Sequence, residues 1–576
     1  MPEQKLQFSA IVGVPNPPQF LWQVNGVVGG SPSTGTITAD GVYTAPSTST
    51  AQQIQISVRS QPATATVSIF DPSHPTPGSV AATQNPLVAA YTMPVPLGAS
   101  VQVQFGTDKT YGQSTSIVTP PPAGGAVTVL VAGMRASTPY HMQATVRIPS
   151  SGPVVDSDHV FTTGTVPVSV IPNITTQQFG GATPSPGVEL LALDPDQGGN
   201  QLTALATDLS GNVIWYYAIG AGEWPDPIKL LPNGHMLVVA SPPANSSGIV
   251  VPGAGVNEVR EIDLAGNIIN RITIPEIDTG LQALGSTIQV QSLHHDILPL
   301  SNGHFILLAN YPQTVGTTPV LGDVLIDWDP QRGPVWYWSA FDHLNTDRAP
   351  YGISDWTHSN AVIYSPDDGD LILSMRNQNW IIKINYQDGS GDGSILWRFG
   401  LDGDFTLPGQ DAPIEWNYGQ HYVSIQSPNS SGIFSLMFFN NGNNRLMNSN
   451  NVVCSSPGVA ACYSSVPVFE LNEYTKTASV LSEDNLTPSY SICCGDAQVL
   501  PSGNLEYDVA YDIFMPGVSY VQEVVPGTTP QVIWQMNIKG MLAYRAFRIP
   551  SLYPGVDWTI PPPNAGVEKA AATNSK

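Results

Sequence analysis

DWTHSNAVIYSPDDGDLILSMRNQNWIIKINYQDGSGDGSILWRFG, from Asp355 to Gly400, contains four apolar runs separated by turn-forming residues. The runs cover 360–364, 370–375, 380–385 and 394–399, and each has the length of a short strand. The breaks between them are rich in Ser, Pro, Asp, Asn and Gly, which favour tight turns. Four short antiparallel strands in tandem are typical of one blade of a β-propeller.

The same pattern of short apolar runs and turn-forming residues repeats along most of the chain after residue 183. One recurring phrase is a strand, a turn of the Pro-Asn-Gly kind and a second strand, as in IKLLPNGHMLVV (228–239), HDILPLSNGHFILL (295–308) and AQVLPSGNLEYDV (497–509). Another is a strand, an Asp/Asn-Gly turn and a strand ending in Trp, as in ATDLSGNVIWYY (206–217). Such a unit, recurring at roughly 40 to 60 residues, favours propeller blades over an array of β-sandwiches. We expect six blades, at 183–220, 225–275, 293–340, 358–400, 421–482 and 493–538, with 541–555 closing the ring.

The residues before the repeats form two further modules. Residues 1–70 carry WQVNG and GVYTAP and resemble a bacterial Ig-like domain. Residues 79–165 resemble a fibronectin III-like sandwich, in which Tyr140 pins a corner. The predicted fold class is therefore all-β: two Ig-like or fibronectin III-like β-sandwiches, a six-bladed β-propeller over 175–560, and a flexible tail over 561–576.

Composition excludes several functions. The 576 residues carry a formal net charge of −24, which argues against nucleic acid or an anionic membrane as partner. No apolar run is long enough for a transmembrane helix. The start, MPEQKLQFSA, does not resemble a signal peptide, so a cytoplasmic location stays open. Sparse Lys and the Ig-like modules favour a periplasmic or secreted protein.

The four cysteines fall in two pairs. Cys454 and Cys462 flank a short Ser/Pro/Gly loop, which predicts a disulfide between them. Cys493 and Cys494 are adjacent, and either a vicinal disulfide or two free thiols would fit, with free thiols favoured.

Three predicted blades open with histidine: His294 and His295, then His358, then His421. Equivalent positions of successive blades converge on the axis, so these residues and Arg376 are expected to share one site. His358 and Asn360 lie two residues apart, which places both side chains on one side of a strand. A metal site made of histidines alone is possible, although catalytic zinc sites often include a carboxylate, for which Asp296 and Asp355 are available. Arg376 beside a dication is unfavourable. Arginine, histidine and asparagine together suit a bound oxyanion, so no metal and no cofactor are expected.

The repeat region resembles the bacterial arylsulfotransferases that need no nucleotide sulfate donor. The resemblance covers most of 183–555 and is carried by HHDILPLSNG, DWTHSNAVIYSPDDGDLILSMRNQNWIIKI, LWRFG, GQHYVSI and YRAFRIPSLY. It implies a six-bladed propeller that moves a sulfuryl group between phenols through a sulfated histidine.

The resemblance also implies roles for individual residues. His421 matches the histidine that is sulfated, and His294 or His295 matches a further active-site histidine that protonates the leaving phenoxide. Side chains alternate along a strand, and comparison with the position of His358 favours His294. The spacing between histidine and aspartate leaves His295 open. His358, Asn360 and Arg376 match residues that hold the sulfuryl oxygens. Two departures from the family pattern stand out: Tyr422 occupies a position where an acidic residue is expected, and the polar residue of the last blade has only Ser491 and Thr487 as candidates.

The implied reaction is ping-pong, from a phenolic sulfate donor to a phenol acceptor. Trp356, Tyr418 and Tyr422 are candidates for stacking on the aryl rings, with blade packing as the alternative. Two other functions stay open: a non-catalytic propeller that binds a ligand or partner, and a metal-dependent hydrolase or lyase that uses the histidines as ligands. Whether the chain forms a homo-oligomer is left open.

Overall fold

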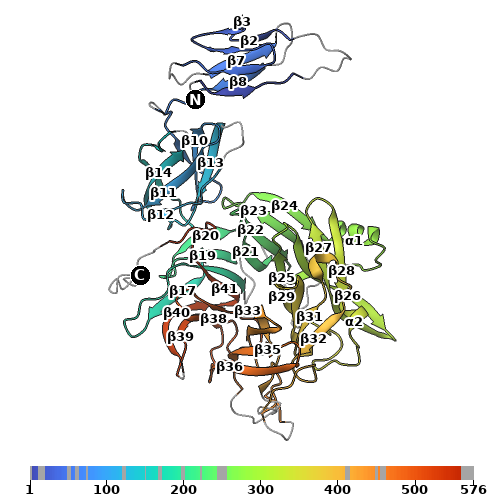
Figure 1. Ribbon diagram of the computed structural model, residues 1–576. Helices are drawn as coiled ribbons and strands as arrows, with labels where there is room; N and C mark the ends of the chain where they lie inside the picture. Colours follow the sequence, from blue (N-terminus) through green and yellow to red (C-terminus); the bar gives the residue numbers. More distant parts are fainter. Residues whose placement is uncertain are drawn as a thin grey trace. The chain divides into compact units, whose positions relative to one another are not determined.

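The computed structural model describes residues 3–10, 20–47, 53–58, 64–72, 75–119, 125–149, 151–166, 171–195, 202–220, 223–242, 256–408, 415–447, 452–454, 462–527 and 529–558. The chain divides into two compact units, residues 1–165 and 166–576. Both are built mostly of strands, as the sequence predicts (Figure 1). The predicted tail over 561–576 lies outside the described residues.

The first unit begins with two small sheets that pack on each other. One has the strand order β1 (Lys5–Gln7), β6 (Val42–Thr44), β5 (Gly35–Ile37) and β4 (Gly30–Ser31). The other has the order β3 (Val27–Val28), β2 (Trp22–Val24), β7 (Gln53–Val58) and β8 (Thr64–Ser68). Trp22, Tyr43 and Ile56 lie in their shared core, so the WQVNG and GVYTAP phrases supply its aromatic residues.

Two more sheets complete the first unit. One has the order β13 (Gly125–Val131), β10 (Ala89–Val95) and β9 (Ser79–Ala82). The other contains β12 (Gln113–Ser114), β11 (Ser100–Gly106), β14 (Pro139–Arg147), β15 (Val154–Val155) and β16 (His159–Thr162). Along β10 and β14, buried residues alternate with less buried ones, as a sheet with one covered face requires. The Tyr140 hydroxyl accepts a hydrogen bond from the Arg135 N–H at 3.0 Å, which ties the corner before β14.

The described residues of the second unit form six antiparallel sheets, here numbered in chain order. Sheet 1 contains β20 (Val213–Tyr217), β19 (Ala204–Thr207), β18 (Val188–Pro195) and β41 (Met541–Ile549). Sheet 2 contains β21 (Trp224–Leu230), β22 (Met236–Ser241), β23 (Glu258–Ile262) and β24 (Ile268–Thr273). Sheet 3 contains β25 (Ser292–Pro299), β26 (Phe305–Val315), β27 (Thr318–Asp329) and β28 (Gly333–Ser339).

The other three sheets carry the C-terminal half of the unit. Sheet 4 contains β29 (Ser359–Ser365), β30 (Asp370–Met375), β31 (Trp380–Ile384) and β32 (Ile395–Phe399). Sheet 5 contains β33 (His421–Ser430), β34 (Ile433–Phe439), β35 (Ser465–Asn472) and β36 (Thr477–Asn485). Sheet 6 has the order β17 (Asn173–Gln178), β40 (Gln531–Lys539), β39 (Val518–Val525), β38 (Leu505–Val509) and β37 (Ala497–Val499). The described helices are short: α1 (Ile274–Ala283), α2 (Ala340–His343), η2 (Arg376–Gln378) and η3 (Gln387–Gly389).

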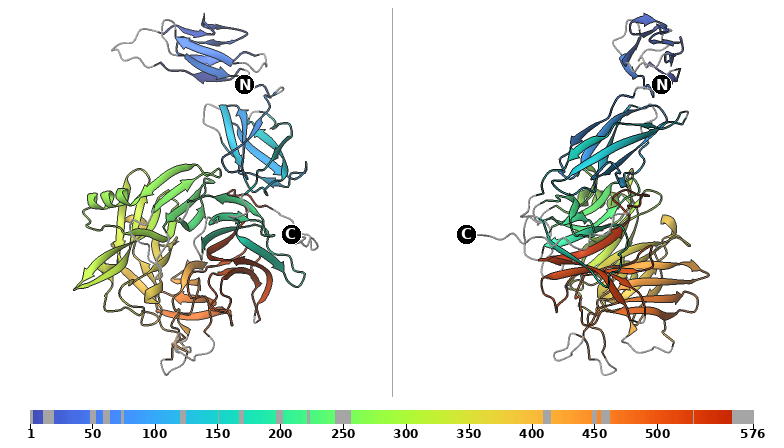
Figure 2. Two further views of the ribbon diagram at one scale, coloured as in Figure 1. Left: turned by 180° about the vertical axis from the view of Figure 1, so that it is seen from behind. Right: turned by 90° about the vertical axis from the view of Figure 1, so that its left-hand side faces the viewer.

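Successive sheets lie side by side through their leading strands. β21 contacts β25, β25 contacts β29, β29 contacts β33, and β33 contacts β37. In Figure 2 the strands of this unit can be followed by colour from green through yellow to red. β41 pairs with β18 and also contacts β38, so the last described strand joins sheet 1 to sheet 6. β17, from the start of the unit, pairs with β40 of sheet 6 and makes a second such joint.

The tryptophans that end the repeated strands couple one sheet to the next. Each is buried, and its indole N–H donates to an acceptor in or beside a turn of the following sheet: Trp215 to Leu264 O (2.8 Å), Trp338 to Gly393 O (2.9 Å), Trp397 to Glu473 Oε1 (2.8 Å) and Trp534 to Leu209 O (3.0 Å). The last of these runs from sheet 6 back to sheet 1. The repeated Trp is thus explained by the need of a buried indole for an acceptor.

A buried ion cluster holds the joint between sheets 1 and 6. Arg548 of β41 is 6% exposed and pairs with Glu189 of β18, Glu506 of β38 and Glu523 of β39. Burial raises the pKa of Glu506 well above its usual value, although Arg548 opposes the shift. One guanidinium therefore serves three buried carboxyl groups, and its loss would leave them uncompensated.

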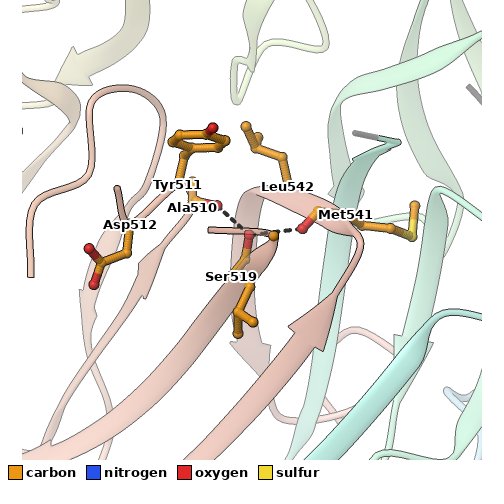
Figure 3. Close-up of a pocket in the computed structure, with 8 residues that line it drawn as sticks. Ala510, Tyr511, Asp512, Ser519, Met541 and Leu542 are labelled. Atoms are coloured by element: carbon orange, nitrogen blue, oxygen red, sulfur yellow. Dashed lines mark hydrogen bonds between the residues drawn. The ribbon is translucent and has the colours of Figure 1, made fainter. Parts of the chain in front are cut away.

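Beside the same joint lies a small cavity of about 10 Å³, room for roughly one water molecule (Figure 3). It is lined by residues that include Tyr511, Ser519 and Leu542. The Ser519 hydroxyl donates toward the carbonyls of Ala510 and Met541 and accepts from the Ala543 N–H at 3.1 Å. These contacts give the serine a structural role between β39 and β41.

Candidate functional site

The histidines predicted to share a site lie at the starts of three neighbouring leading strands. His294 and His295 belong to β25, His358 immediately precedes β29, and His421 begins β33. The ring of His295 lies 4.8 Å from that of His294 and 4.7 Å from that of His358, between centroids. His421 lies close enough to His358 and Arg376 for their charges to lower its pKa. The structure therefore brings together side chains from sheets 3, 4 and 5.

The same backbone irregularity occurs at all three strand starts. His295, His358 and Tyr422 have φ of 58°, 45° and 44°. These values lie in the left-handed region, which residues other than glycine rarely adopt. A register shift accompanies each, between Leu293 and Ile297, between Ser359 and Ala361, and between His421 and Val423. Bulges of this kind redirect side chains and are common beside active sites. Strand alternation fails here, so the parity argument that paired His358 with Asn360 and favoured His294 over His295 is wrong.

His421 is held in one tautomer by Asn441. The Asn441 amide nitrogen donates to the carbonyls of Ser491 and Cys494, both at 3.1 Å, which fixes the orientation of the amide. Its oxygen must then accept from His421 Nδ1, at 2.7 Å, so Nδ1 carries the proton and Nε2 keeps a lone pair. The Cys494 N–H donates to that lone pair at 3.2 Å.

The charge state of His421 follows from its surroundings. Its side chain is buried, with 1% exposure. Burial lowers the pKa of His421 well below its usual value, and the positive charges of Arg376 and Arg545 lower it further. The imidazole is therefore neutral near pH 7, with an unprotonated Nε2 that can act as a nucleophile.

His294 and His295 form a chain that ends on a carboxylate. His294 Nε2 lies 3.3 Å from Asp323 Oδ1, and His294 Nδ1 lies 2.7 Å from His295 Nδ1. Burial lowers the pKa of His295 well below its usual value, with His358 and His294 adding to the effect. The pKa of Asp323 is lowered, because hydrogen bonding and charge from His294 outweigh burial, which acts in the opposite direction. A proton can thus pass between the two rings and come to rest beside a carboxylate.

His358 and Arg376 face the same region from sheet 4. The Nδ1 atom of His358 lies 2.5 Å from Asp355 Oδ2, which orients the ring. Arg376 is half-buried at the start of η2 and donates to Asn377 Oδ1 at 2.7 Å and to the Ile492 carbonyl at 3.3 Å. Its guanidinium therefore lies at the segment that also contacts His421.

The backbone of that segment, Ser491–Gly495, holds several side chains of the site in place. Four of its carbonyls accept hydrogen bonds from side chains of the site: Ser491 and Cys494 from Asn441, Ile492 from Arg376, and Gly495 from Arg545 at 2.5 Å. Arg545 also donates to the Asn360 carbonyl at 3.1 Å, and its guanidinium carbon lies 5.4 Å from the centre of the Tyr422 ring. Arg545 is 3% exposed, so one buried cation connects the segment to the start of β29.

Sequence reasoning missed Asn441 and Arg545. Arg545 lies in the YRAFRIPSLY phrase, but nothing local marks it as part of the site, because β41 reaches the site only through its pairing with β18. Asn441 follows β34 in the polar run NNGNNR, where an asparagine ordinarily indicates a turn. Asn441 positions His421, which is the role expected of an acidic residue at position 422, where this chain has Tyr422.

Several predicted contacts differ in the structure. Trp356 is fully buried and donates its indole N–H to the Arg348 carbonyl at 2.8 Å, and Tyr418 is 2% exposed in the core, so both pack between strands. The Asn360 amide donates to the Gln420 carbonyl at 2.7 Å, which ties β29 to the residue before His421. Tyr422 is half-buried, with its ring centre 5.3 Å from that of Phe547.

The candidates from the last repeat are also occupied by structural contacts. The Ser491 hydroxyl donates to the Cys493 carbonyl at 2.8 Å, and the exposed Thr487 hydroxyl donates to Asn485 Oδ1 at 2.5 Å. Asp296 accepts from the Val362 N–H at 2.9 Å and pairs with Lys229. Within the described ranges, no three His, Cys, Asp or Glu side chains are grouped as metal ligands would be.

The two cysteine pairs differ. Cys454 and Cys462 form a disulfide with an S–S distance of 2.04 Å. Cys493 and Cys494 are free and half-buried, and the Cys494 thiol donates to the Cys493 sulfur at 2.8 Å. No helix in the described part of the chain is long and apolar enough to cross a membrane.

Comparisons with known proteins identify the family but not a close relative. A search of curated proteins gives no match. Among solved structures, the dihydro-heme d1 dehydrogenase NirN matches with a TM-score of 0.28 and 10% identity, over 65% of this chain and 80% of that chain. A mutant of the Synechocystis apocarotenoid oxygenase matches with a TM-score of 0.24 and 10% identity, over 76% of this chain and 75% of that chain.

The family comparison is decisive because it spans more than half of the chain. The model of the family "Arylsulfotransferase (ASST)" matches residues 186–545, which include every residue of the site described above. The chain therefore belongs to the arylsulfotransferase family, which implies aryl sulfotransferase activity on phenolic substrates.

Proposed function

We propose that this protein transfers a sulfuryl group from a phenolic sulfate ester to a second phenol, without a nucleotide donor, through a sulfated His421. The observation that carries the proposal is the fixed tautomer of a buried, neutral His421, whose Nε2 lone pair lies near Arg376. We further propose that the six sheets of residues 166–576 form a six-bladed propeller. The side-by-side leading strands and the β41 joint between sheets 1 and 6 support this architecture.

In the first half-reaction, His421 Nε2 leaves its hydrogen bond with the Cys494 N–H and attacks the sulfur atom. An N–S bond forms while the bond between sulfur and the aryl oxygen breaks, and that electron pair leaves on the phenoxide. Asn441 keeps the Nδ1 proton in place, so the ring becomes a sulfated imidazolium. Arg376 and His358 neutralise the sulfuryl oxygens as charge spreads over them.

The proton needed by the phenoxide comes from the His294–His295 chain. A proton on His294, stabilised beside Asp323, passes to His295 Nδ1 while His295 releases its Nε2 proton to the leaving oxygen. In the second half-reaction the chain runs in reverse and takes the proton of the acceptor phenol. Storage of the proton on His294 keeps positive charge away from His295, whose neighbours His358 and Arg545 disfavour it.

The test is a transfer assay with an aryl sulfate, a phenol acceptor and a chelator, and with no nucleotide. Wild type is expected to release the donor phenol and form the acceptor sulfate, whereas His421→Ala forms none. His235→Ala is the matched control, because His235 is half-exposed and pairs with Glu261 in sheet 2. Transfer by His421→Ala, or a requirement for metal, would refute the mechanism.

We also propose that the protein is exported to an oxidising compartment. The Cys454–Cys462 disulfide supports this location, since such bonds persist outside the cytosol. Fractionation of the native host, followed by detection of the protein, tests it. Recovery in the cytosolic fraction alone would contradict it.

A further inference from the structure

Cys493 and Cys494 are connected to the nucleophile by their backbone, because the N–H of the peptide between them donates to His421. Their sulfurs lie 2.8 Å apart, against about 2.05 Å in a disulfide. Cys494 has φ of 65°, and its N–H is the group that donates to His421 Nε2 at 3.2 Å. Both residues are half-buried, so part of each is open to solvent.

The segment is held on both sides of the Cys493–Cys494 peptide, and the carbonyl of that peptide accepts from the Ser491 hydroxyl at 2.8 Å. The Ile492 carbonyl accepts from Arg376 at 3.3 Å, and the Gly495 carbonyl accepts from Arg545 at 2.5 Å. A bond between the two sulfurs would close a small ring that contains this peptide bond. The peptide nitrogen in that ring is the one that donates to His421, so ring closure must reorient the N–H.

The two thiols are also unequal in reactivity. The hydrogen bond from Cys494 lowers the pKa of the Cys493 thiol, with Arg376 adding to the effect against burial. The same hydrogen bond raises the pKa of the Cys494 thiol. Cys493 is thus the thiolate that attacks first, and Cys494 is the thiol that follows.

We propose that Cys493 and Cys494 are a redox modification site, which a low-molecular-weight disulfide closes into a vicinal disulfide that withdraws the Cys494 N–H from His421 Nε2 and speeds the sulfation of His421. The Cys493 thiolate attacks one sulfur of glutathione disulfide and releases one glutathione thiolate. Cys494 then loses its proton to that thiolate and attacks the Cys493 sulfur, which releases the second glutathione. Two electrons pass from the cysteine pair to glutathione disulfide, and two glutathione molecules are formed.

The effect on rate rests on the proposed function, whereas closure of the pair does not. Full-length protein is equilibrated in glutathione buffers of rising oxidised fraction and then trapped with an alkylating reagent. Peptide mapping reports the state of Cys493–Cys494 separately from that of Cys454–Cys462. Sulfation of His421 by donor alone is measured in parallel, and the ring resonances of His421 are followed by NMR.

The oxidised pair is expected to speed sulfation by about 5-fold, because Nε2 no longer has to break a hydrogen bond before it attacks. In Cys493→Ala, the ratio of rates in oxidising and reducing buffer should become 1. In Cys454→Ala/Cys462→Ala, the wild-type ratio should persist.

Three results would overturn the inference: a pair that stays reduced in every buffer, an oxidised pair with unchanged sulfation, or unchanged His421 resonances on oxidation. If neither form transfers a sulfuryl group, the proposed function fails, and the resonances of His421 alone decide whether closure of the pair reaches the imidazole.

Discussion

Asn441 Oδ1 and His421 Nδ1 lie 2.7 Å apart, and the amide of Asn441 can face only one way because its nitrogen serves two carbonyls. A neutral asparagine therefore orients the nucleophile without adding a negative charge. A carboxylate at this position would favour the imidazolium and occupy the lone pair with a proton. The arrangement keeps Nε2 unprotonated in a site that contains two arginines.

The pH dependence of His421 sulfation provides the first prediction. Because the pKa of His421 lies well below 6.5, the rate of sulfation should stay constant as pH falls through 6.5 and decline only at more acidic pH. Asn441→Asp should move this acid limb to higher pH, since the carboxylate stabilises the protonated ring. Single-turnover sulfation across a pH series measures both profiles. An acid limb at the same pH in both proteins would contradict the role given to Asn441.

Arg376 should be required in both half-reactions. Its removal is expected to cost about 3 kcal/mol of transition-state stabilisation, or roughly a hundredfold in rate. Arg376→Lys should recover only part of this, because an ammonium cannot reproduce the planar donor pair of a guanidinium. Arg332→Ala is the matched control, since Arg332 is an exposed arginine that pairs with Asp329. Stopped-flow rates with donor, and then with acceptor, separate the two steps.

The proton chain should make His294 and His295 distinguishable from His421. His295→Ala is expected to slow departure of basic phenoxides most, and the defect should shrink as the donor phenol becomes more acidic. His294→Ala should act in the same direction and weaken the pH dependence of the second half-reaction, because the proton store beside Asp323 is lost. A series of substituted phenyl sulfates measures this as a change in the slope of rate against leaving-group pKa. Equal losses across the series would rule out proton transfer by this pair.

Arg545 should act on position and not on the substrate. Two of its hydrogen bonds fix the carbonyls of Gly495 and Asn360, so Arg545→Gln should loosen the segment that faces His421. We expect kcat to fall about 10-fold with little change in KM, as for a group that orients catalytic residues without touching the substrate. Hydrogen exchange at residues 491–495, faster in the variant, distinguishes this from a direct contact. A rise in KM with unchanged kcat would indicate that Arg545 binds the substrate.

Arg548 should be essential for stability. Arg548→Met leaves Glu189, Glu506 and Glu523 buried without a cation, at a cost of about 3 to 5 kcal/mol. Carboxyl groups whose folded pKa exceeds the unfolded value lose stability as pH rises between the two, so the deficit should be larger at pH 8 than at pH 5. Denaturant unfolding at both pH values tests this. A deficit independent of pH would show that lost packing, and not charge, is responsible.

The repeat made much of the second unit predictable. A strand, a turn and a strand ending in Trp depend on local chemistry, and each of the six repeat units does lie in its own sheet. The tryptophans also turn out to couple neighbouring sheets, which explains why the phrase recurs. The strand β17 of sheet 6 could not be predicted from its own residues, NITTQQ, because its place depends on pairing with β40, more than three hundred residues away.

The candidate site was likewise predictable only in part. The sequence by itself determined that the histidines open successive repeats and that Arg376 follows a strand of one of them, because position within a repeat is a local property. Only the tertiary structure decided their orientations, since bulges at His295, His358 and Tyr422 break the alternation on which parity depends. It also decided the partners: Asn441 reaches His421 across a hairpin, and Arg545 arrives on the strand that joins sheets 1 and 6. Such contacts depend on long-range pairing and on the burial that shifts the pKa of His421, and neither is written in the residues next to it.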